Sequence, residues 1–337
     1  MRSASTATSG AVRAIVCTGD GVIVRRTPIS SDSPQPAPGE AVIRPIRLGV
    51  SGIDRSIAAG RFPFTGVMGH EFVGVVEVVG GTDVAKLRGA RVVASMILPC
   101  GRCELCQRGL GDHCRKRVLP GVQGRDGCFA DRFTLPTSAL IRVPDRVDDD
   151  QAVCVHLVAS AIQAARQLTI EGKPYITVLG DGPLGLVAVQ VMAKLNASVR
   201  LIGKHHEKLA ICEKWGIKHR HVDDIGRRAD QDVVVDCTGC AEGFELATKL
   251  VRPRGTIVLK SLGVQMSGGA ADSAAVVMNE LSVIGSFAGP VGEAMAKLAS
   301  HEVDVVSLIS KRMSLADGAA VIRAAEQPGI IKVLFEP

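Results

Sequence analysis

Thr177-Val178-Leu179-Gly180-Asp181-Gly182-Pro183-Leu184-Gly185 joins an apolar segment to a run rich in Ala, Val and Leu. A G-x-G-x-x-G spacing in this context predicts the turn between a β-strand and an α-helix. Gly180 permits the tight turn, Gly182 lets the backbone approach a pyrophosphate, and Gly185 lets helix and strand pack closely. The helix N-terminus then faces the phosphates, so the stretch predicts a dinucleotide-binding site. A glycine turn that holds no ligand is the alternative.

The end of the next expected strand, residues 199–203, bears on which nicotinamide cofactor binds. A site for NAD normally carries an acid there, about 20 residues after the glycines, which holds the ribose hydroxyls. Here Gly203 stands in that place, and Lys204 and His205 follow it. The missing acid removes a repulsion against a 2′-phosphate, and the basic side chains can donate to it. We therefore predict NADP(H), and we expect Gly203→Asp to shift the preference toward NAD(H). Solvated loop residues without a ligand are the alternative.

The segments around this motif predict two kinds of architecture. Apolar strands alternate with helical stretches at 176–180, 199–203, 232–237, 255–260 and 282–286. This alternation predicts an α/β fold with a doubly wound parallel sheet. Before about residue 148, short Val- and Ile-rich runs are separated by Gly, Pro and Asp, which predicts antiparallel strands in a barrel-like domain.

Composition narrows the class of protein. The chain has 337 residues, enough for about two domains. Its net charge is +6, but the basic residues are scattered and there is one Trp and one Tyr, which argues against a nucleic-acid partner. No apolar run reaches the roughly 18–20 residues of a membrane span, and the first ten residues lack the apolar centre of a signal peptide. We therefore expect a cytoplasmic protein that binds no membrane.

Four of the ten cysteines form a separate cluster. Cys100, Cys103, Cys106 and Cys114 have the spacing C-x2-C-x2-C-x7-C. Such spacing lets one turning loop aim four thiolates at a single Zn²⁺ ion, and four sulfur ligands close the site, so the zinc is expected to be structural. An iron–sulfur cluster is the alternative, since similar spacings serve those clusters.

These motifs, in this order, resemble those of the zinc-containing medium-chain dehydrogenase/reductase family, which includes alcohol, polyol, glucose and threonine dehydrogenases. The matching segments are Gly49–Asp54, Gly69–Glu71, Pro99–Cys114, Asp236–Gly239, Arg252–Gly255 and Ile331–Val333. The resemblance covers nearly the whole chain. It implies a GroES-like β-barrel catalytic domain at 1–147 and 291–337, with a structural zinc lobe at 95–118. It also implies a Rossmann NADP(H)-binding domain at 148–290, and pairing into a homodimer or homotetramer through an edge at 271–284.

The expected catalytic centre departs from the family pattern. Family members hold an open catalytic zinc with a motif cysteine, the histidine of G-H-E, and a Glu or Cys near the Rossmann domain. Here Ser51 replaces the cysteine, and His156 stands where the carboxylate usually lies. Ile53 replaces the hydroxyl residue that passes the substrate proton. His70, Glu71 and His156 remain as candidate ligands of a catalytic zinc, with Asp54 implied to orient His70.

The resemblance implies hydride transfer between NADP(H) and a small alcohol, polyol or sugar, or its carbonyl. The expected catalytic residues are His70, Glu71, Ser51, Asp54 and His156. The expected cofactor contacts are Gly180, Gly182, Pro183, Leu184, Gly185, Gly203, Lys204, His205 and Thr238. Two alternatives stay open: a family member without catalytic zinc, as in quinone or enoyl reductases, and a non-catalytic NADPH-binding sensor. His156 could also be a packing residue.

Overall fold

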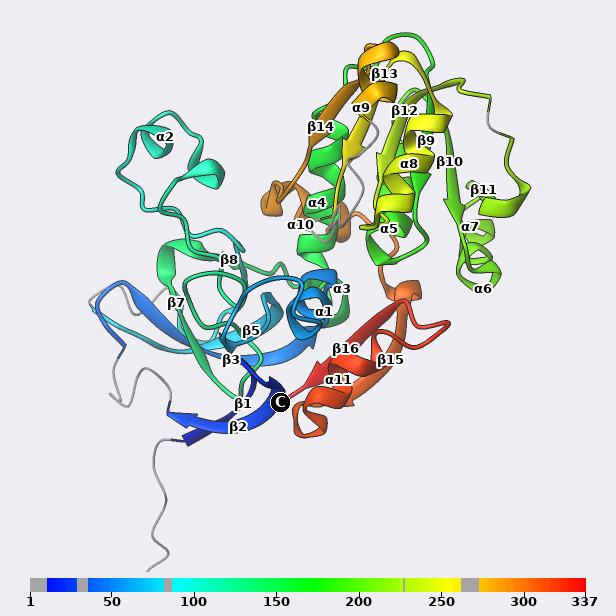
Figure 1. The fold of residues 1–337 in the computed structure, drawn as a ribbon. Coiled ribbons are helices and arrows are strands. Elements are labelled where there is room, and N and C mark those ends of the chain that lie inside the picture. The colour runs from blue at the N-terminus through cyan, green and yellow to red at the C-terminus, as the bar shows by residue number, and fades with distance from the viewer. Residues whose placement is uncertain (1–10, 29–35, 82–86, 227, 262–272) are drawn as a thin grey trace, which may run out of the picture.

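The computed structural model describes residues 11–28, 36–81, 87–226, 228–261 and 273–337. Figure 1 shows a lobe with a parallel sheet at the upper right and a β-rich lobe below it. A cysteine-bearing segment around α2 (Glu104–Gln107) extends away from both. Parts of the predicted barrel domain, residues 1–10, 29–35 and 82–86, lie outside the described residues.

The first lobe contains a six-stranded parallel sheet, as the alternation of strands and helices predicts. Its strand order is β11-β10-β9-β12-β13-β14, so the order reverses beside β9. The glycine-rich turn follows β9 at this reversal, where parallel sheets of this kind bind their ligands. The strands are β9 (Tyr175–Leu179), β10 (Ser198–Gly203), β11 (Lys218–His221), β12 (Gln231–Asp236), β13 (Val251–Leu259) and β14 (Ser282–Gly285).

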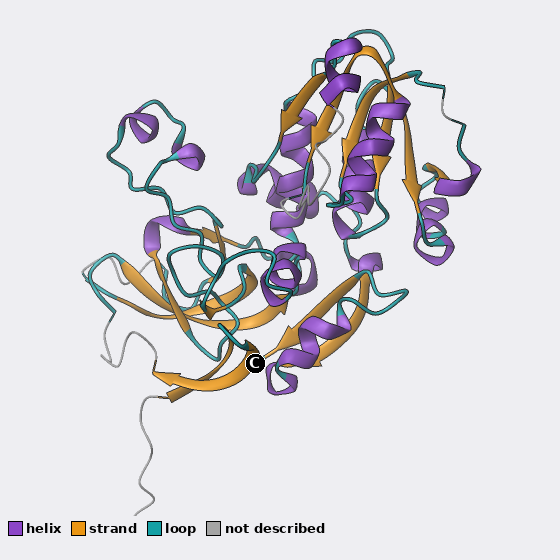
Figure 2. Ribbon diagram, in the orientation of Figure 1, coloured by secondary structure: helices purple, strands orange, loops and turns teal. Residues whose placement is uncertain are grey.

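Helices cover both faces of this sheet (Figure 2). They are α4 (Val155–Arg166), α5 (Pro183–Met192), α6 (His206–Leu209), α7 (Ile211–Lys214), α8 (Ala241–Leu250), α9 (Ser273–Met278) and α10 (Val291–Ala299). Pro183 opens α5 at its first position, where the missing N–H removes no intrahelical bond. The buried side chains of α4 and α10 belong to the same apolar core. Helix α10 begins at Val291, where we expected the chain to return from the Rossmann domain to the catalytic domain. This domain boundary remains a prediction.

The second lobe is built from mainly antiparallel sheets, in which only β15 and β16 pair in parallel among the described strands, and it confirms the GroES-like β-barrel expectation. One sheet orders β15-β16-β3-β5-β6-β8 with β7 beside β3, and a smaller one orders β2-β1-β4. The strands are β1 (Ala11–Thr18), β2 (Gly21–Pro28), β3 (Glu40–Gly49), β4 (Gly66–Val67), β5 (Glu71–Val79), β6 (Arg91–Ala94), β7 (Phe133–Pro136), β8 (Leu140–Arg142), β15 (Ile309–Ser314) and β16 (Lys332–Glu336).

The C-terminal strand returns the chain to the barrel lobe. In β16, Leu334 pairs with Gly49 of β3, so residues from opposite ends of the chain share one sheet. The remaining helices of this lobe and its junction are α1 (Gly52–Ala58), α3 (Asp149–Ala152) and α11 (Ala319–Ala324). Among the described residues, no helix has the length and apolar character that crossing a membrane requires.

Candidate active site

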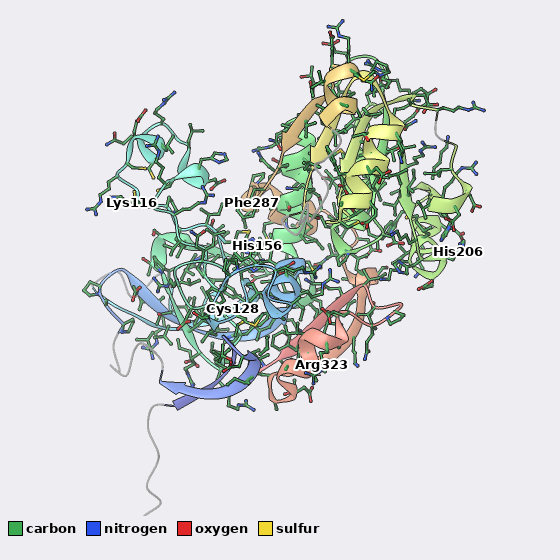
Figure 3. The ribbon with its side chains drawn as sticks, in the orientation of Figure 1. Lys116, Cys128, His156, His206, Phe287 and Arg323 are labelled. Carbon is green, nitrogen blue, oxygen red and sulfur yellow. The ribbon has the colours of Figure 1, made fainter. Side chains whose placement is uncertain are left out.

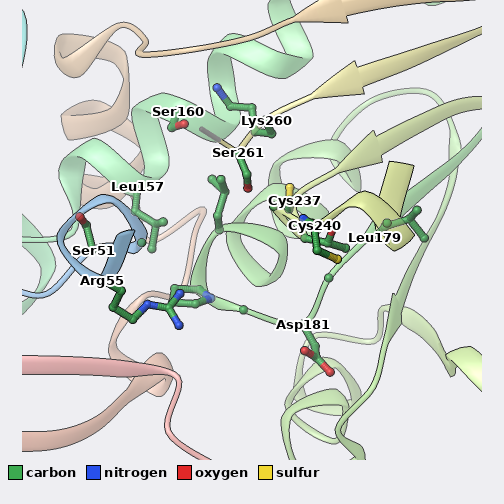
Figure 4. Close-up of a pocket in the computed structure, with 18 of the residues that line it drawn as sticks. Ser51, Arg55, Leu157, Ser160, Leu179, Asp181, Cys237, Cys240, Lys260 and Ser261 are labelled. Carbon is green, nitrogen blue, oxygen red and sulfur yellow. Dashed lines mark hydrogen bonds between the residues drawn. The ribbon is translucent and has the colours of Figure 1, made fainter. Parts of the chain in front are cut away.

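A cleft of about 720 Å³ lies between the two lobes, and both contribute to its lining. The barrel lobe contributes Ser51, His70 and Glu71, while His156 reaches it from α4. Figure 3 shows His156 between the lobes, and Figure 4 shows Ser51 and Arg55 on one side with Asp181 on another. The cofactor-binding residues expected from the sequence also line this cleft, except Gly185, which is buried beneath it.

The glycine-rich turn has the backbone geometry that its sequence predicts. Gly180 adopts φ +102°, a region that side chains disfavour. A Cβ on Gly185 would lie 1.8 Å from the carbonyl oxygen of Gly180, so only glycine allows strand and helix to approach this closely. A Cβ on Gly182 would meet nothing within 4 Å, because this residue faces the open cleft. The turn therefore presents bare backbone and the N-terminus of α5 to the cleft.

The four clustered cysteines meet at one point of the projecting segment. The sulfur of Cys103 lies 3.4 Å from that of Cys106 and 3.7 Å from that of Cys114. Tetrahedral zinc with Zn–S bonds of about 2.3 Å places its sulfurs roughly 3.8 Å apart. Backbone hydrogen bonds, from Arg102 and Cys103, lower the pKa of Cys100 to about 6, which favours the thiolate. The geometry fits a closed zinc site, away from the cleft.

Two buried histidines face each other at the cleft. The ring centroids of His70 and His156 lie 6.1 Å apart, with an interplanar angle of 62°. Burial and the neighbouring His70 lower the pKa of His156 to about 3, so its imidazole is neutral. In His70, Nδ1 is buried without a hydrogen-bond partner among the described residues. Neutral imidazoles have the lone pairs that metal binding requires.

Comparisons with known proteins agree with both lobes. Residues 37–145 match the model of the alcohol dehydrogenase GroES-like domain, and residues 183–304 match that of zinc-binding dehydrogenases. The L-threonine 3-dehydrogenase of Streptomyces avermitilis is 30% identical over 332 residues, covering 90% of this chain and 94% of that protein. The chain belongs to the zinc-containing medium-chain dehydrogenase/reductase family.

Two further proteins are similar to this chain over nearly its full length. The L-threonine 3-dehydrogenase of Chelativorans sp. is 27% identical, covering 93% of this chain and 95% of that protein. Among solved structures, a zinc-binding dehydrogenase from Sinorhizobium meliloti bound to NADP superposes with a TM-score of 0.85. It is 27% identical, with 98% of this chain and 100% of that chain covered.

Ser51, which we expected to replace the family's motif cysteine, serves as the N-cap of α1. Its hydroxyl donates to Asp54 Oδ2 at 2.6 Å and accepts from the Asp54 N–H at 3.2 Å. The Ser51 N–H donates to the same carboxylate at 2.7 Å. Burial raises the pKa of Asp54, although His70 and the bonds from Ser51 act in the opposite direction. Asp54 Oδ1 is buried without a partner among the described residues. Ser51 and Asp54 thus form one unit at the start of α1.

Glu71 pairs with Lys332, which lies in the matching segment Ile331–Val333 but had no role assigned from the sequence. Lys332, 1% exposed, donates from Nζ to Glu71 Oε2 and to the carbonyl oxygen of Val50 at 2.9 Å. Burial lowers the pKa of Lys332, but the adjacent Glu71 outweighs it, so this pKa is raised. The carboxylate that we expected as a candidate zinc ligand is therefore engaged by a buried cation.

Other cleft residues also escaped the sequence analysis. Arg55 and Arg61 line the cleft, and among the described residues neither guanidinium has an ion-pair or hydrogen-bond partner. Burial lowers the pKa of Arg55 and Arg61 adds to this effect, although the charge of Glu326 acts in the opposite direction. At the far wall, burial lowers the pKa of Lys260 to about 8, and its Nζ donates to Ser286 Oγ at 3.1 Å. The position of Arg55 beside the Gly49–Asp54 motif was the only signal in the sequence.

Proposed function

We propose that this chain transfers a hydride between C4 of NADP(H) and a small alcohol, polyol or sugar, or the corresponding carbonyl. The observation that carries this proposal is the shared cleft: the glycine-rich turn and the two buried imidazoles open onto the same cavity. A nicotinamide nucleotide on the turn can therefore reach a substrate held by the barrel lobe.

The lining of the cleft near β10 supports NADP(H). Lys204, His205 and Lys208 line it there, and Gly203 adds no side chain. Basic side chains can bind a 2′-phosphate through charge-assisted hydrogen bonds. The Sinorhizobium meliloti relative, bound to NADP and 27% identical, adds support for this cofactor.

We propose His70 and His156 as the protein ligands of a catalytic zinc. The unpartnered Nδ1 of His70 and the neutral imidazole of His156 fit such an ion. A bound zinc would polarise a carbonyl or acidify an alcohol. Asp54 lies close enough to His70 for the two groups to interact electrostatically, and it would orient the His70 ring. Lys332 fixes the carboxylate of Glu71, the next residue in the chain. Ile53 has no hydroxyl, so we assign proton transfer to Ser56, which lines the cleft, together with water.

One observation favours the alternative without catalytic zinc. The hydroxyl of Ser51 is bonded to Asp54, and the carboxylate of Glu71 is bonded to Lys332, so neither is a free ligand. Elemental analysis of the purified chain separates the two forms, since the first predicts two zinc ions per chain and the second predicts one. His70→Ala should remove one zinc and turnover together. Full turnover with unchanged zinc in this variant would refute the zinc-dependent form.

Turnover itself separates an enzyme from a non-catalytic sensor. We expect NADPH oxidation with members of a broad panel of aldehydes and ketones, or NADP⁺ reduction with alcohols and polyols. Binding of NADPH without turnover of any compound would instead support the sensor.

We also propose that two copies pair through β14. This strand pairs with β13 on one side, and it forms the edge of the sheet in the described part of the chain. Large apolar side chains are exposed beside that edge: Val283 by 40%, Val277 by 73% and Met278 by 82%. A symmetric pairing of two edges would cover them. Residues 271 and 272 of the expected edge lie outside the described residues.

A further inference from the structure

The end of β10 is occupied by a carboxylate from another part of the chain. Asp181, the second residue of the glycine-rich turn, is buried and points toward this strand end. Its Oδ2 accepts the N–H groups of Lys204 and His205, each at 2.7 Å. Nδ1 of His205 lies 3.0 Å from both carboxylate oxygens. Asp181 therefore fills the place where a side chain at residue 203 would lie.

The position of Asp181 leaves room only for glycine at residue 203. A Cβ on Gly203 would lie 2.5 Å from Asp181 Oδ2 and 2.7 Å from its Cγ. If Asp181 moved aside, the backbone N–H groups of Lys204 and His205 would lose their acceptor. The glycine thus does not show that the site lacks an acid, as the sequence suggested. The acid reaches the same position from the turn after β9.

We propose that Asp181 is the residue that sets the balance between phosphorylated and unphosphorylated nicotinamide nucleotides. This inference rests on the proposed function. Sites for NAD use a carboxylate at the end of the second strand to hold the ribose hydroxyls, and a carboxylate there repels a 2′-phosphate. Asp181 supplies that charge, whereas Lys204 and Lys208 on the cleft wall attract the phosphate. The difference in binding free energy between NADP(H) and NAD(H) then depends on the balance between this repulsion and this attraction.

Asp181→Asn removes the charge while keeping the hydrogen bonds. The amide oxygen can accept the N–H groups of Lys204 and His205, and the amide nitrogen can donate to Nδ1 of His205. We expect the ratio of dissociation constants, NADH over NADPH, to rise about tenfold, because one repulsive charge near the phosphate is lost. Titration calorimetry with NADPH and NADH on the zinc-loaded protein measures both constants.

A matched control removes one carboxylate from the same edge of the sheet. Glu207 is exposed on α6 and does not line the cleft. We expect Glu207→Gln to change the ratio by less than about twofold, because solvent and salt screen its charge. A tenfold rise in this control as well would overturn the assignment to Asp181.

Moving the acid back to β10 tests the position independently of the asparagine variant. Gly203→Asp alone should weaken both nucleotides, because the new side chain collides with Asp181. Adding Asp181→Gly frees the space, and the double variant should bind with a ratio within about threefold of the original. A double variant shifted more than about tenfold toward NADH would show that Asp181 does not act as this acid.

The outcomes separate this inference from the proposed function. If both nucleotides bind and Asp181→Asn leaves the ratio within about twofold, the inference is wrong and the function stands. If neither nucleotide binds to the unmodified chain, the function and the inference fall together.

Discussion

Lys332→Met removes the cation that is bonded to Glu71 inside the barrel lobe. Lys332 is 1% exposed and Glu71 is 3% exposed, so both charges are largely shielded from water. Methionine preserves most of the aliphatic length of lysine, and the change in packing is therefore small. The variant leaves a buried carboxylate and the Val50 carbonyl without this donor.

The cost of this change follows from the burial of the pair. Removing one partner of a buried ion pair costs about 3–5 kcal/mol, because the remaining charge is uncompensated. With each kcal/mol worth about 2–4 °C, we expect the Tm of the barrel lobe to fall by about 6–20 °C. Removing both charges with Lys332→Met and Glu71→Gln together should recover part of this loss.

The dependence on pH has a definite sign. The pKa of Lys332 is raised in the folded state, so its contribution is fully present below the unfolded value of 10.5 and is lost as pH rises through the folded value. The difference between the variant and the original chain should therefore be constant from about pH 6 to pH 9, and should shrink only above about pH 10.5.

Thermal unfolding followed by circular dichroism measures these differences. Lys218→Met places the same substitution at an exposed position of β11 and should stay within about 0.5 kcal/mol of the original stability. A Lys332→Met protein as stable as this control would refute our account of the buried pair.

Three further predictions address the cofactor turn, the cysteine cluster and the subunit edge. Gly185→Ala should weaken NADPH binding by about tenfold or more in calorimetry, because the added methyl forces the turn open; unchanged affinity would contradict the turn geometry. Cys103→Ser should release one zinc per chain and lower the Tm by about 5 °C or more, with turnover retained at low temperature; unchanged metal content would contradict a zinc site there. Val283→Lys should yield monomers in light scattering; persistence of the original assembly would exclude this edge.

Features encoded by local spacing could be predicted from the sequence. The turn at Gly180–Gly185 and the cluster at Cys100–Cys114 each use residues close together in the chain, so spacing alone fixes their geometry. The alternation of strands and helices likewise predicted the parallel-sheet lobe, and short Val- and Ile-rich runs separated by turn residues predicted the barrel lobe. Strand β11 was not predicted, because its sequence Lys-His-Arg-His contains no apolar run.

Contacts between distant segments could not be predicted in this way. Lys332 and Glu71 are 261 residues apart, and only the return of β16 to the barrel brings them together. Asp181 was visible in the motif, but its direction depends on how β9 and β10 lie side by side. The sequence therefore indicated the absence of an acid after β10, whereas the fold supplies one from the neighbouring turn.

Calorimetric titration of the unmodified chain with NADPH tests the central claim most directly, since every proposed step needs the nucleotide in the cleft. We predict saturable binding at one site per chain, and binding weakened by about tenfold or more in the Gly185→Ala variant. The absence of binding by NADPH and by NADH would contradict the account, whatever metal the protein contains.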